Sequence, residues 1–292
     1  MSNALPILLA AAGAATRPDA AQDDKLSPFM TTLCGMGICV LLVWIAYVLM
    51  NPEKFKLSNS PGRRNSLTPL HVLGLLLGAL FASAALAAGI QMNTELDSDL
   101  LAIIMGLTFP ALLISGLPIA AYCFDDGAAR GMGFTPRRWI SDSIRSVITL
   151  FAVLPVCVGL LLATRWAIRQ LNPDLLNTHE FLTILTRPET PIAWSVMVIA
   201  AAVVMAPIGE EILFRGLLQS MLRRYMGRPW IGIVLASILF ASVHMTVPDS
   251  LPALFALSIA LGYSYERTGR LWAPIMIHML FNAVMIADAV TS

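Results

Sequence analysis

Residues 65–94 read NSLTPLHVLGLLLGALFASAALAAGIQMNT and contain no Asp, Glu, Lys or Arg. A helix that crosses a bilayer needs roughly 20 mostly apolar residues, so this stretch is long enough to span a membrane. Seven other windows also lack charged residues; they are 26–52, 100–124, 146–164, 190–209, 229–248, 250–265 and 271–287. The sequence therefore predicts an all-α, polytopic membrane helix bundle with about eight transmembrane helices.

The composition argues against other classes of protein. Of the 292 residues, 57% are hydrophobic and 13% are charged, whereas about 25% of an ordinary soluble domain is charged. The net charge of +1 gives no basic surface for nucleic acid. The four cysteines lie in apolar windows without metal-ligand spacing. The expected surroundings are therefore the lipid bilayer, with no nucleic-acid partner.

The basic residues predict the topology. The loops 53–64, 125–145, 210–228 and 266–270 hold 14 of the 19 Lys and Arg residues. Cytoplasmic loops of membrane proteins collect Lys and Arg, so these loops are expected in the cytoplasm and both termini outside. The predicted location is the cell (plasma or inner) membrane, which the chain crosses several times.

The chain divides into three parts by the polarity of its windows. Residues 1–25 are either a short translocated tail or a cleaved signal segment, and the apolar stretch 4–15 leaves both open because no Lys or Arg precedes it. Residues 26–190 hold four windows with little chemistry and are expected to be a transmembrane scaffold. Residues 191–292 hold four windows with polar groups inside them, so a four-helix catalytic core is expected there, integrated with the scaffold.

Two adjacent carboxylates mark the fifth window, in Ala-Pro-Ile-Gly-Glu-Glu-Ile-Leu-Phe-Arg-Gly at 206–216. An acidic residue at membrane depth costs on the order of 3 kcal/mol and is a functional candidate by default. On a helix Glu211 faces Arg215 four residues later, so these two are expected to form a structural pair. Glu210 lies about 140° away from Arg215 and is left available for proton transfer. The alternative is a charged turn in headgroup water.

Two later windows carry further polar side chains. The sixth contains Phe240 and, four residues later, His244; the eighth contains His278 and Asn282, also four residues apart and therefore on one helical face. A single histidine in an apolar helix is more often a packing residue than a catalytic one. Polar groups in three windows together favour a shared site.

The turns between windows bring these groups together. Gly227 follows a basic last turn and precedes Arg228-Pro229, which is typical of a helix stop. Glu210 and His244 each lie 17 residues from this tip, so two antiparallel helices would hold them at the same depth, roughly 25 Å away. His278 lies nine residues past a second tip at Gly269, roughly 14 Å away. Helix tilt, or projection of the Arg-rich hairpin, has to absorb the difference.

These elements resemble a known family. Glu210-Glu211 with Arg215, then Phe240 with His244, then His278 with Asn282, in this order, is similar to the CPBP family, the type II CAAX prenyl endopeptidase-like or Abi-type intramembrane proteases. The stretch 265–275, Tyr-Glu-Arg-Thr-Gly-Arg-Leu-Trp-Ala-Pro-Ile, also looks like bacterial members. The resemblance covers roughly residues 191–288.

The resemblance implies an intramembrane peptidase that is similar to CAAX prenyl protease 2. It implies that Glu210 and His244 activate a water molecule and that His278 and Asn282 stabilise the oxyanion. Glu211, Arg215 and Phe240 would then be supporting residues. The implied partner is a membrane-embedded peptide or protein substrate, lipidated or CAAX-like, which reaches a polar cavity from the cytoplasmic side.

Three questions stay open at this point. The mechanism needs no cofactor if a glutamate base acts alone, which we favour because the sequence lacks compact His-His spacing; otherwise Glu210, His244 and His278 would hold one zinc ion. A non-catalytic membrane protein, such as a bacteriocin-immunity factor, is the alternative function. A proton-coupled transporter is a third reading, although no internal repeat is evident.

Overall fold

The computed structural model describes residues 26–93, 97–124, 131–133, 135, 138–176 and 180–291. The tail or signal segment predicted over 1–25 lies outside the described residues, as does part of the predicted loop 125–145. Within the described part the protein is helical and has no strand, which confirms the predicted fold class.

Every charge-free window corresponds to a helical segment. The helices longer than fifteen residues are α2 (Pro28–Met50), α4 (Pro69–Asn93), α5 (Ser98–Phe124), α7 (Trp139–Leu171), α13 (Leu251–Thr268) and α14 (Trp272–Thr291). The fifth window lies in a continuous run made of α9 (Ile192–Ile199), η3 (Ala200–Met205), α10 (Ala206–Glu211), η4 (Ile212–Gln219) and α11 (Ser220–Met226). The shorter elements are α3 (Pro52–Phe55), η1 (Leu57–Asn59), η2 (Pro173–Leu175), α8 (Glu180–Thr186), α12 (Pro229–Ser242) and η5 (Pro248–Ser250).

Six of these segments are long and apolar enough to cross a membrane: 28–50, 69–93, 98–116, 139–171, 192–226 and 272–291. The protein is therefore a multi-pass membrane protein. The structure differs from the prediction of about eight spans at two helices, α12 and α13. The window 229–248 forms only the 14 residues of α12 because the chain turns at 243–246. The 18 residues of α13 end in Tyr-Glu-Arg-Thr and are the more polar of the two.

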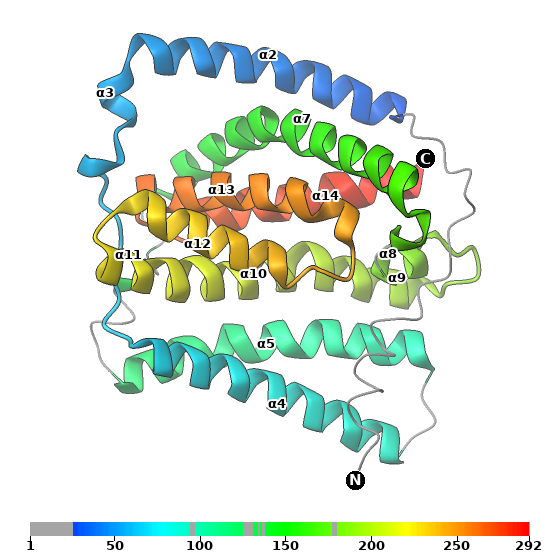
Figure 1. The fold of residues 1–292 in the computed structure, drawn as a ribbon. Helices are drawn as coiled ribbons and strands as arrows, with labels where there is room; N and C mark the ends of the chain where they lie inside the picture. Colours follow the sequence, from blue (N-terminus) through cyan, green and yellow to red (C-terminus); the bar gives the residue numbers. More distant parts are fainter. Residues whose placement is uncertain are drawn as a thin grey trace.

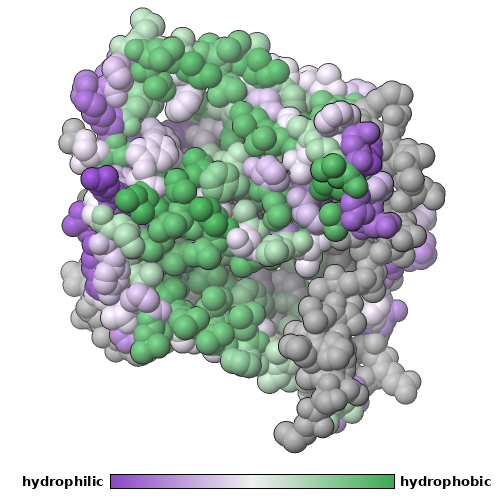
Figure 2. All heavy atoms as spheres, viewed as in Figure 1, coloured by the Kyte–Doolittle hydropathy of each residue, from purple (hydrophilic) through white to green (hydrophobic). Residues whose placement is uncertain are grey.

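The helices form layers (Figure 1). The central layer consists of α13 and α14 with the run α9–α11 and α12 beside them, and α7 packs on both α13 and α14. On one side α2 covers α7; on the other, α5 packs against α10 and carries α4 outside it. Apolar side chains cover the middle of the visible face and hydrophilic ones gather at its edges (Figure 2), as expected for a bundle surrounded by lipid.

The two predicted helix tips are confirmed. Gly227 ends α11 with φ 69° and Gly269 ends α13 with φ 61°. Both values lie in the left-handed region, which costs glycine nothing but is unfavourable for residues with a Cβ. The two tips and the Arg-rich turns lie at the same end of the bundle, which we call the basic end (Figure 1).

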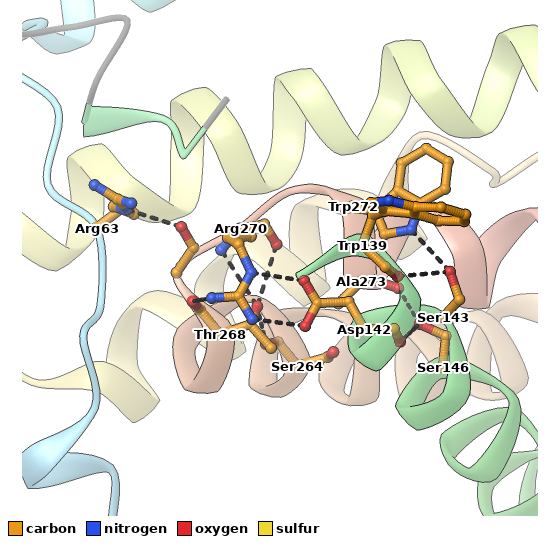
Figure 3. A network of polar contacts seen from close by, with 11 residues as sticks. Arg63, Trp139, Asp142, Ser143, Ser146, Ser264, Thr268, Arg270, Trp272 and Ala273 are labelled. Atoms are coloured by element: carbon orange, nitrogen blue, oxygen red, sulfur yellow. Dashed lines mark hydrogen bonds and ion pairs between the residues drawn. The ribbon is translucent and has the colours of Figure 1, made fainter. Parts of the chain in front are cut away.

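A network of polar contacts ties the elements together at the basic end (Figure 3). Arg270 donates two hydrogen bonds of 2.6 Å to the carboxylate of Asp142, at the start of α7. Bidentate pairs of this kind are among the strongest hydrogen bonds in proteins. Hydrogen bonding to Asp142 raises the pKa of Arg270 and outweighs the opposing effect of burial. The contact fixes α7 to the turn between α13 and α14.

The segment 56–68 closes this end as a strap between α3 and α4. Arg63 donates to the carbonyl of Gly269 at 2.8 Å, and Ser60 donates to Glu266 at 3.1 Å. The buried amide of Asn65 donates to the carbonyl of Leu217 at 2.8 Å. The strap therefore holds the basic end against the core of the bundle.

Candidate active site

Two π-helical segments flank the pair Glu210-Glu211. The segment η3 ends at Met205 and η4 begins at Ile212, so the six residues of α10 lie between two wider turns. Single π-helical turns inside α-helices are rare and occur frequently at functional sites. This widening presents both carboxylates to α14.

The predicted pair of Glu211 and Arg215 is confirmed as a contact. Nη1 of Arg215 lies 2.8 Å from Oε1 of Glu211, and both side chains are almost fully buried. Nη2 of Arg215 donates to the hydroxyl of Ser258 at 2.7 Å, which fixes the guanidinium against α13. The alternative of a charged turn in headgroup water is wrong, because neither side chain of this pair is exposed.

His278 lies between the two glutamates. Its Nδ1 is 2.9 Å from Oε1 of Glu211, and its Nε2 is 3.9 Å from Oε2 of Glu210. A carboxylate oxygen that accepts from Arg215 is an acceptor, so Nδ1 of His278 donates to the same oxygen of Glu211. A neutral His278 then presents the lone pair of Nε2 towards Glu210, and only an imidazolium could donate from that nitrogen.

Glu210 itself is partly accessible, with 24% of its side chain exposed. Its Oε2 is buried and has no hydrogen-bond partner in the described part of the chain. Arg215 pairs with Glu211 and not with Glu210. Oε2 of Glu211 also has no partner among the described residues, but the side chain of Glu211 is fully buried and paired with Arg215. Glu210 is thus the carboxylate of the two that is partly accessible and has no ion pair with an arginine.

The prediction that His244 lies within a membrane helix is wrong. The structure places His244 in the turn that follows α12. The chain leaves the helix at Ser242 and turns through 243–246 towards α13. Nδ1 of His244 lies 2.9 Å from the carbonyl oxygen of Phe240. A carbonyl only accepts, so Nδ1 carries the hydrogen, and a neutral His244 has an acceptor nitrogen at Nε2.

Phe240 packs against three of the polar side chains. Its ring centroid lies 5.1 Å from that of His244 and 5.7 Å from that of His278. The guanidinium carbon of Arg215 lies 4.9 Å from the same centroid, within the range of a cation–π contact. Phe240 is fully buried, so it fixes the relative positions of both imidazoles.

The amide of Asn282 is held by the π-helical segment η3. Nδ2 of Asn282 donates to the carbonyl of Ala202 at 2.8 Å. The N–H of Ala206 bonds to Ala201, and the next residue, Pro207, has no N–H to offer Ala202. Asn282 supplies the missing donor, which leaves its second amide hydrogen available.

All four predicted catalytic residues line one cavity of about 260 Å³. Its other walls are mostly apolar and come from α7, α8, α13 and α14. The cavity lies in the half of the bundle away from the basic end: on α7 it is lined by residues 157–165, far from Asp142, and on α13 by the first turns after Ser250.

Two charged residues of this cavity were not among the predicted site residues. Arg165 from α7 and Asp249 from η5 both line it, and Nε of Arg165 donates to Oδ2 of Asp249 at 2.8 Å. In the sequence both are single charges at the edges of apolar windows, and such charges usually mark loops. The two residues carry opposite charges and lie at the same predicted end of the bundle, and this combination could have indicated an ion pair.

The two histidines have the donor chemistry of metal ligands. The hydrogen bonds at both Nδ1 atoms leave Nε2 of His244 and His278 as acceptors, which is the usual state of a metal-bound histidine. However, across the described ranges no three His, Cys, Asp or Glu side chains are grouped so that they could hold a metal ion. The donor atoms therefore suit zinc, but the arrangement of the side chains that carry them does not fit a zinc site.

Residues 192–284 match the family described as type II CAAX prenyl endopeptidase Rce1-like. This stretch begins with α9 and ends within α14, so it includes Glu210, His244, His278 and Asn282. The C-terminal region of this chain is thus similar to the Rce1-like family. The resemblance stated from the sequence is therefore confirmed.

Three curated proteins have sequences related to parts of this chain. An "Uncharacterized 24.3 kDa protein" of Escherichia coli is 33% identical over 79 residues, which are 26% of this chain and 36% of that protein. The "Putative membrane peptidase YdiL" of Bacillus subtilis is 30% identical over 110 residues, 38% of this chain and 41% of that protein. The "Uncharacterized protein YpbD" of B. subtilis is 36% identical over 78 residues, 26% of this chain and 36% of that protein.

The matches thus cover 36–41% of the length of these relatives, which is less than half. No solved structure gives a significant match. What the comparisons support is a membrane protease at the level of the Rce1-like family.

Proposed function

We propose that this protein is an intramembrane endopeptidase that hydrolyses a peptide bond of a membrane-associated substrate. The observation that carries the proposal is that Glu210, His244, His278 and Asn282, from three separate segments of the chain, line one cavity. The match of residues 192–284 to the Rce1-like family and the similarity to a protein named as a putative membrane peptidase support the reaction class.

Glu210 is the proposed general base. Its buried Oε2 has no partner among the described residues, and a water molecule in the cavity would donate a hydrogen to it. Nε2 of a neutral His244 is an acceptor and would orient the same water. A positioned base typically contributes about 10²- to 10⁴-fold to the rate.

Asn282 and His278 are the proposed oxyanion donors. The second amide hydrogen of Asn282 is available, whereas His278 can donate from Nε2 only as an imidazolium, because Glu211 accepts from Nδ1. Carboxylate oxygens of Glu211 and Glu210 lie 2.9 Å and 3.9 Å from the two ring nitrogens of His278. One oxyanion donor is typically worth about 10²- to 10³-fold in rate.

The proposed substrate is a membrane-embedded peptide or protein, lipidated or CAAX-like, because apolar side chains make up most of the cavity walls. Entry from the cytoplasmic side stays a prediction. The strap 56–68 covers the basic end, and the cavity lies in the opposite half of the bundle. If the Arg-rich turns are cytoplasmic, this geometry favours entry from the opposite face or from the side, between helices.

The experiment that tests the function compares the C-termini of membrane proteins in cells that carry the native protein or its Glu210→Gln variant. Cells with the native protein should contain new C-termini that are absent with the variant. Glu189→Gln is the matched control, since Glu189 is exposed and does not line the cavity, and it should behave as the native protein. Identical C-termini with native protein and Glu210→Gln would support a non-catalytic role instead.

A further inference from the structure

The pair formed by Arg165 and Asp249 lies in the same cavity as the proposed catalytic residues but takes no part in the proposed hydrolysis. Arg165 extends from α7 and Asp249 from η5, so the pair joins two elements that are 84 residues apart in the chain. Among the described residues, Nε is the one nitrogen of Arg165 that makes a hydrogen bond, to Oδ2 of Asp249 at 2.8 Å. The side chain of Asp249 is 4% exposed and that of Arg165 is 42% exposed.

Both side chains keep unused hydrogen-bonding atoms. Oδ1 of Asp249 is buried and has no partner within the described ranges, although a buried carboxylate oxygen without a partner is unfavourable. The two terminal nitrogens of Arg165 make no hydrogen bond to the part of the chain that the structure describes. The pair therefore offers two donors and one acceptor beside an apolar wall.

The charge of Arg165 narrows the choice of ligand. It is the only Lys or Arg among the described residues that line this cavity. A guanidinium whose terminal nitrogens are available binds a carboxylate through two parallel hydrogen bonds. The last residue of a peptide carries such a carboxylate next to a backbone N–H, which matches two donors and one acceptor.

We propose that Arg165 and Asp249 bind the C-terminal residue of the peptide substrate. Arg165 holds the free carboxylate through its terminal nitrogens, and Oδ1 of Asp249 accepts the N–H of the same residue. The inference rests on the proposed endopeptidase function and adds a specificity site to it. It makes a free C-terminus a feature that this protein recognises.

The length of the cavity limits how many substrate residues it can hold. Along α14 the lining runs from His278 to Ile286, eight residues or roughly 12 Å. An extended peptide covers about 3.4 Å per residue, so the cavity has room for roughly three or four substrate residues. These residues would lie against Leu161, Phe281 and Met285 and are expected to be apolar.

The test measures binding to full-length protein in lipid nanodiscs, in a Glu210→Gln background so that no peptide is cleaved. The probes are pooled palmitoylated, fluorescent peptides that end in four apolar residues. Each is made with a free C-terminal acid, with a C-terminal amide, and with an acid whose last backbone nitrogen is methylated. The acid should bind about tenfold more tightly than the amide, as loss of a charge-assisted pair predicts. The methylated acid should bind several-fold more weakly than the plain acid.

Variants assign this preference to the pair. In the same background Arg165→Gln should lower binding of the acid to the level of the amide and leave the amide unchanged. Arg169→Gln, one turn further along α7 and outside the cavity lining, should keep the tenfold preference. Arg165→Lys keeps the charge without the planar fork and should reduce the preference to a few-fold.

Several results would overturn the inference. Equal binding of acid and amide to the Glu210→Gln protein would do so without any further variant. Equal loss of both probes in Arg165→Gln would assign Arg165 a structural role. Arg165-dependent retention of phosphatidylglycerol with no preference for the acid would make a lipid headgroup the ligand. Because binding is measured without cleavage, a native protein that cleaves nothing would refute the proposed function and leave this test valid.

Discussion

Oε1 of Glu211 lies 2.9 Å from Nδ1 of His278, and the same oxygen accepts a hydrogen bond from Arg215 at 2.8 Å. One buried carboxylate oxygen therefore joins the helix that carries Glu210 to α14. Glu211 is a positioning residue: it fixes which nitrogen of His278 faces Glu210. This relationship connects the stability of the bundle to the geometry of the candidate site.

Replacing Glu211 with Gln should destabilise the protein by about 3–5 kcal/mol, because Arg215 would remain as a buried charge without its partner. The measurement is the midpoint of unfolding in mild detergent. The double variant Glu211→Gln with Arg215→Met should recover part of that loss, since no unpaired charge is then buried. An unchanged midpoint in the single variant would contradict the role of the pair.

Replacing Phe240 with Leu should lower the rate of peptide cleavage by up to about 100-fold, since displacements of 1 Å at an active site can have effects of this size. Phe240→Ala should in addition cost about 3–5 kcal/mol of stability. Phe214→Leu is the matched control. Phe214 packs edge-on against Phe240, with ring centroids 5.1 Å apart. Phe214→Leu removes the same volume as Phe240→Leu, but Phe214 makes no described ring contact with either histidine. Equal loss of activity in both Leu variants would show that Phe240 acts through general packing alone.

Removal of metal ions should leave cleavage intact if Glu210 acts as the base without a metal. The check is activity after exhaustive dialysis against EDTA and 1,10-phenanthroline, with total zinc measured in the same sample. Loss of activity that added Zn²⁺ restores would establish the zinc alternative, with Glu210, His244 and His278 as the expected ligands. The Nδ1 contacts of both histidines would then orient metal ligands.

The two ends of the bundle should react with reagents from opposite sides of the membrane. Arg228→Cys labels the basic end and Ser250→Cys the cavity end. With a membrane-impermeant maleimide, intact cells should label Ser250→Cys, and Arg228→Cys should react only after permeabilisation, if Lys and Arg mark the cytoplasmic side. The native protein, with its own cysteines, provides the background signal. The reverse pattern would place the cavity end on the cytoplasmic side and would support the predicted entry of substrate from the cytoplasm.

Much of the fold could be predicted because lipid exposure demands long apolar helices, and charges interrupt them. The positions of Gly227 and Gly269 as tips followed from local backbone chemistry. The early end of α12 was not predicted, because residues 243–248 contain no Asp, Glu, Lys or Arg and the charge-free window therefore continues past the helix. The π-helical segments were also missed, since the sequence pattern of an apolar helix does not reveal i to i+5 bonding.

The candidate site was predictable where helix periodicity decides the answer. The four-residue spacing placed Glu211 against Arg215 and put His278 and Asn282 on one face. It could not say which glutamate His278 contacts, because that depends on the relative rotation of two helices. Arg165 and Asp249 were missed for a similar reason: their pairing is a tertiary contact, and each alone looks like the end of a loop.

The short length of α12 has a consequence for the bilayer around it. Its 14 residues extend roughly 21 Å, whereas the hydrocarbon layer is about 30 Å thick. A segment shorter than the layer is accommodated by thinning of the nearby membrane. The headgroups of one leaflet would then lie closer to the turn that bears His244. Bulk water could reach the site at a depth where lipid tails would otherwise exclude water. The proposed hydrolysis consumes one water molecule for each bond that is cleaved.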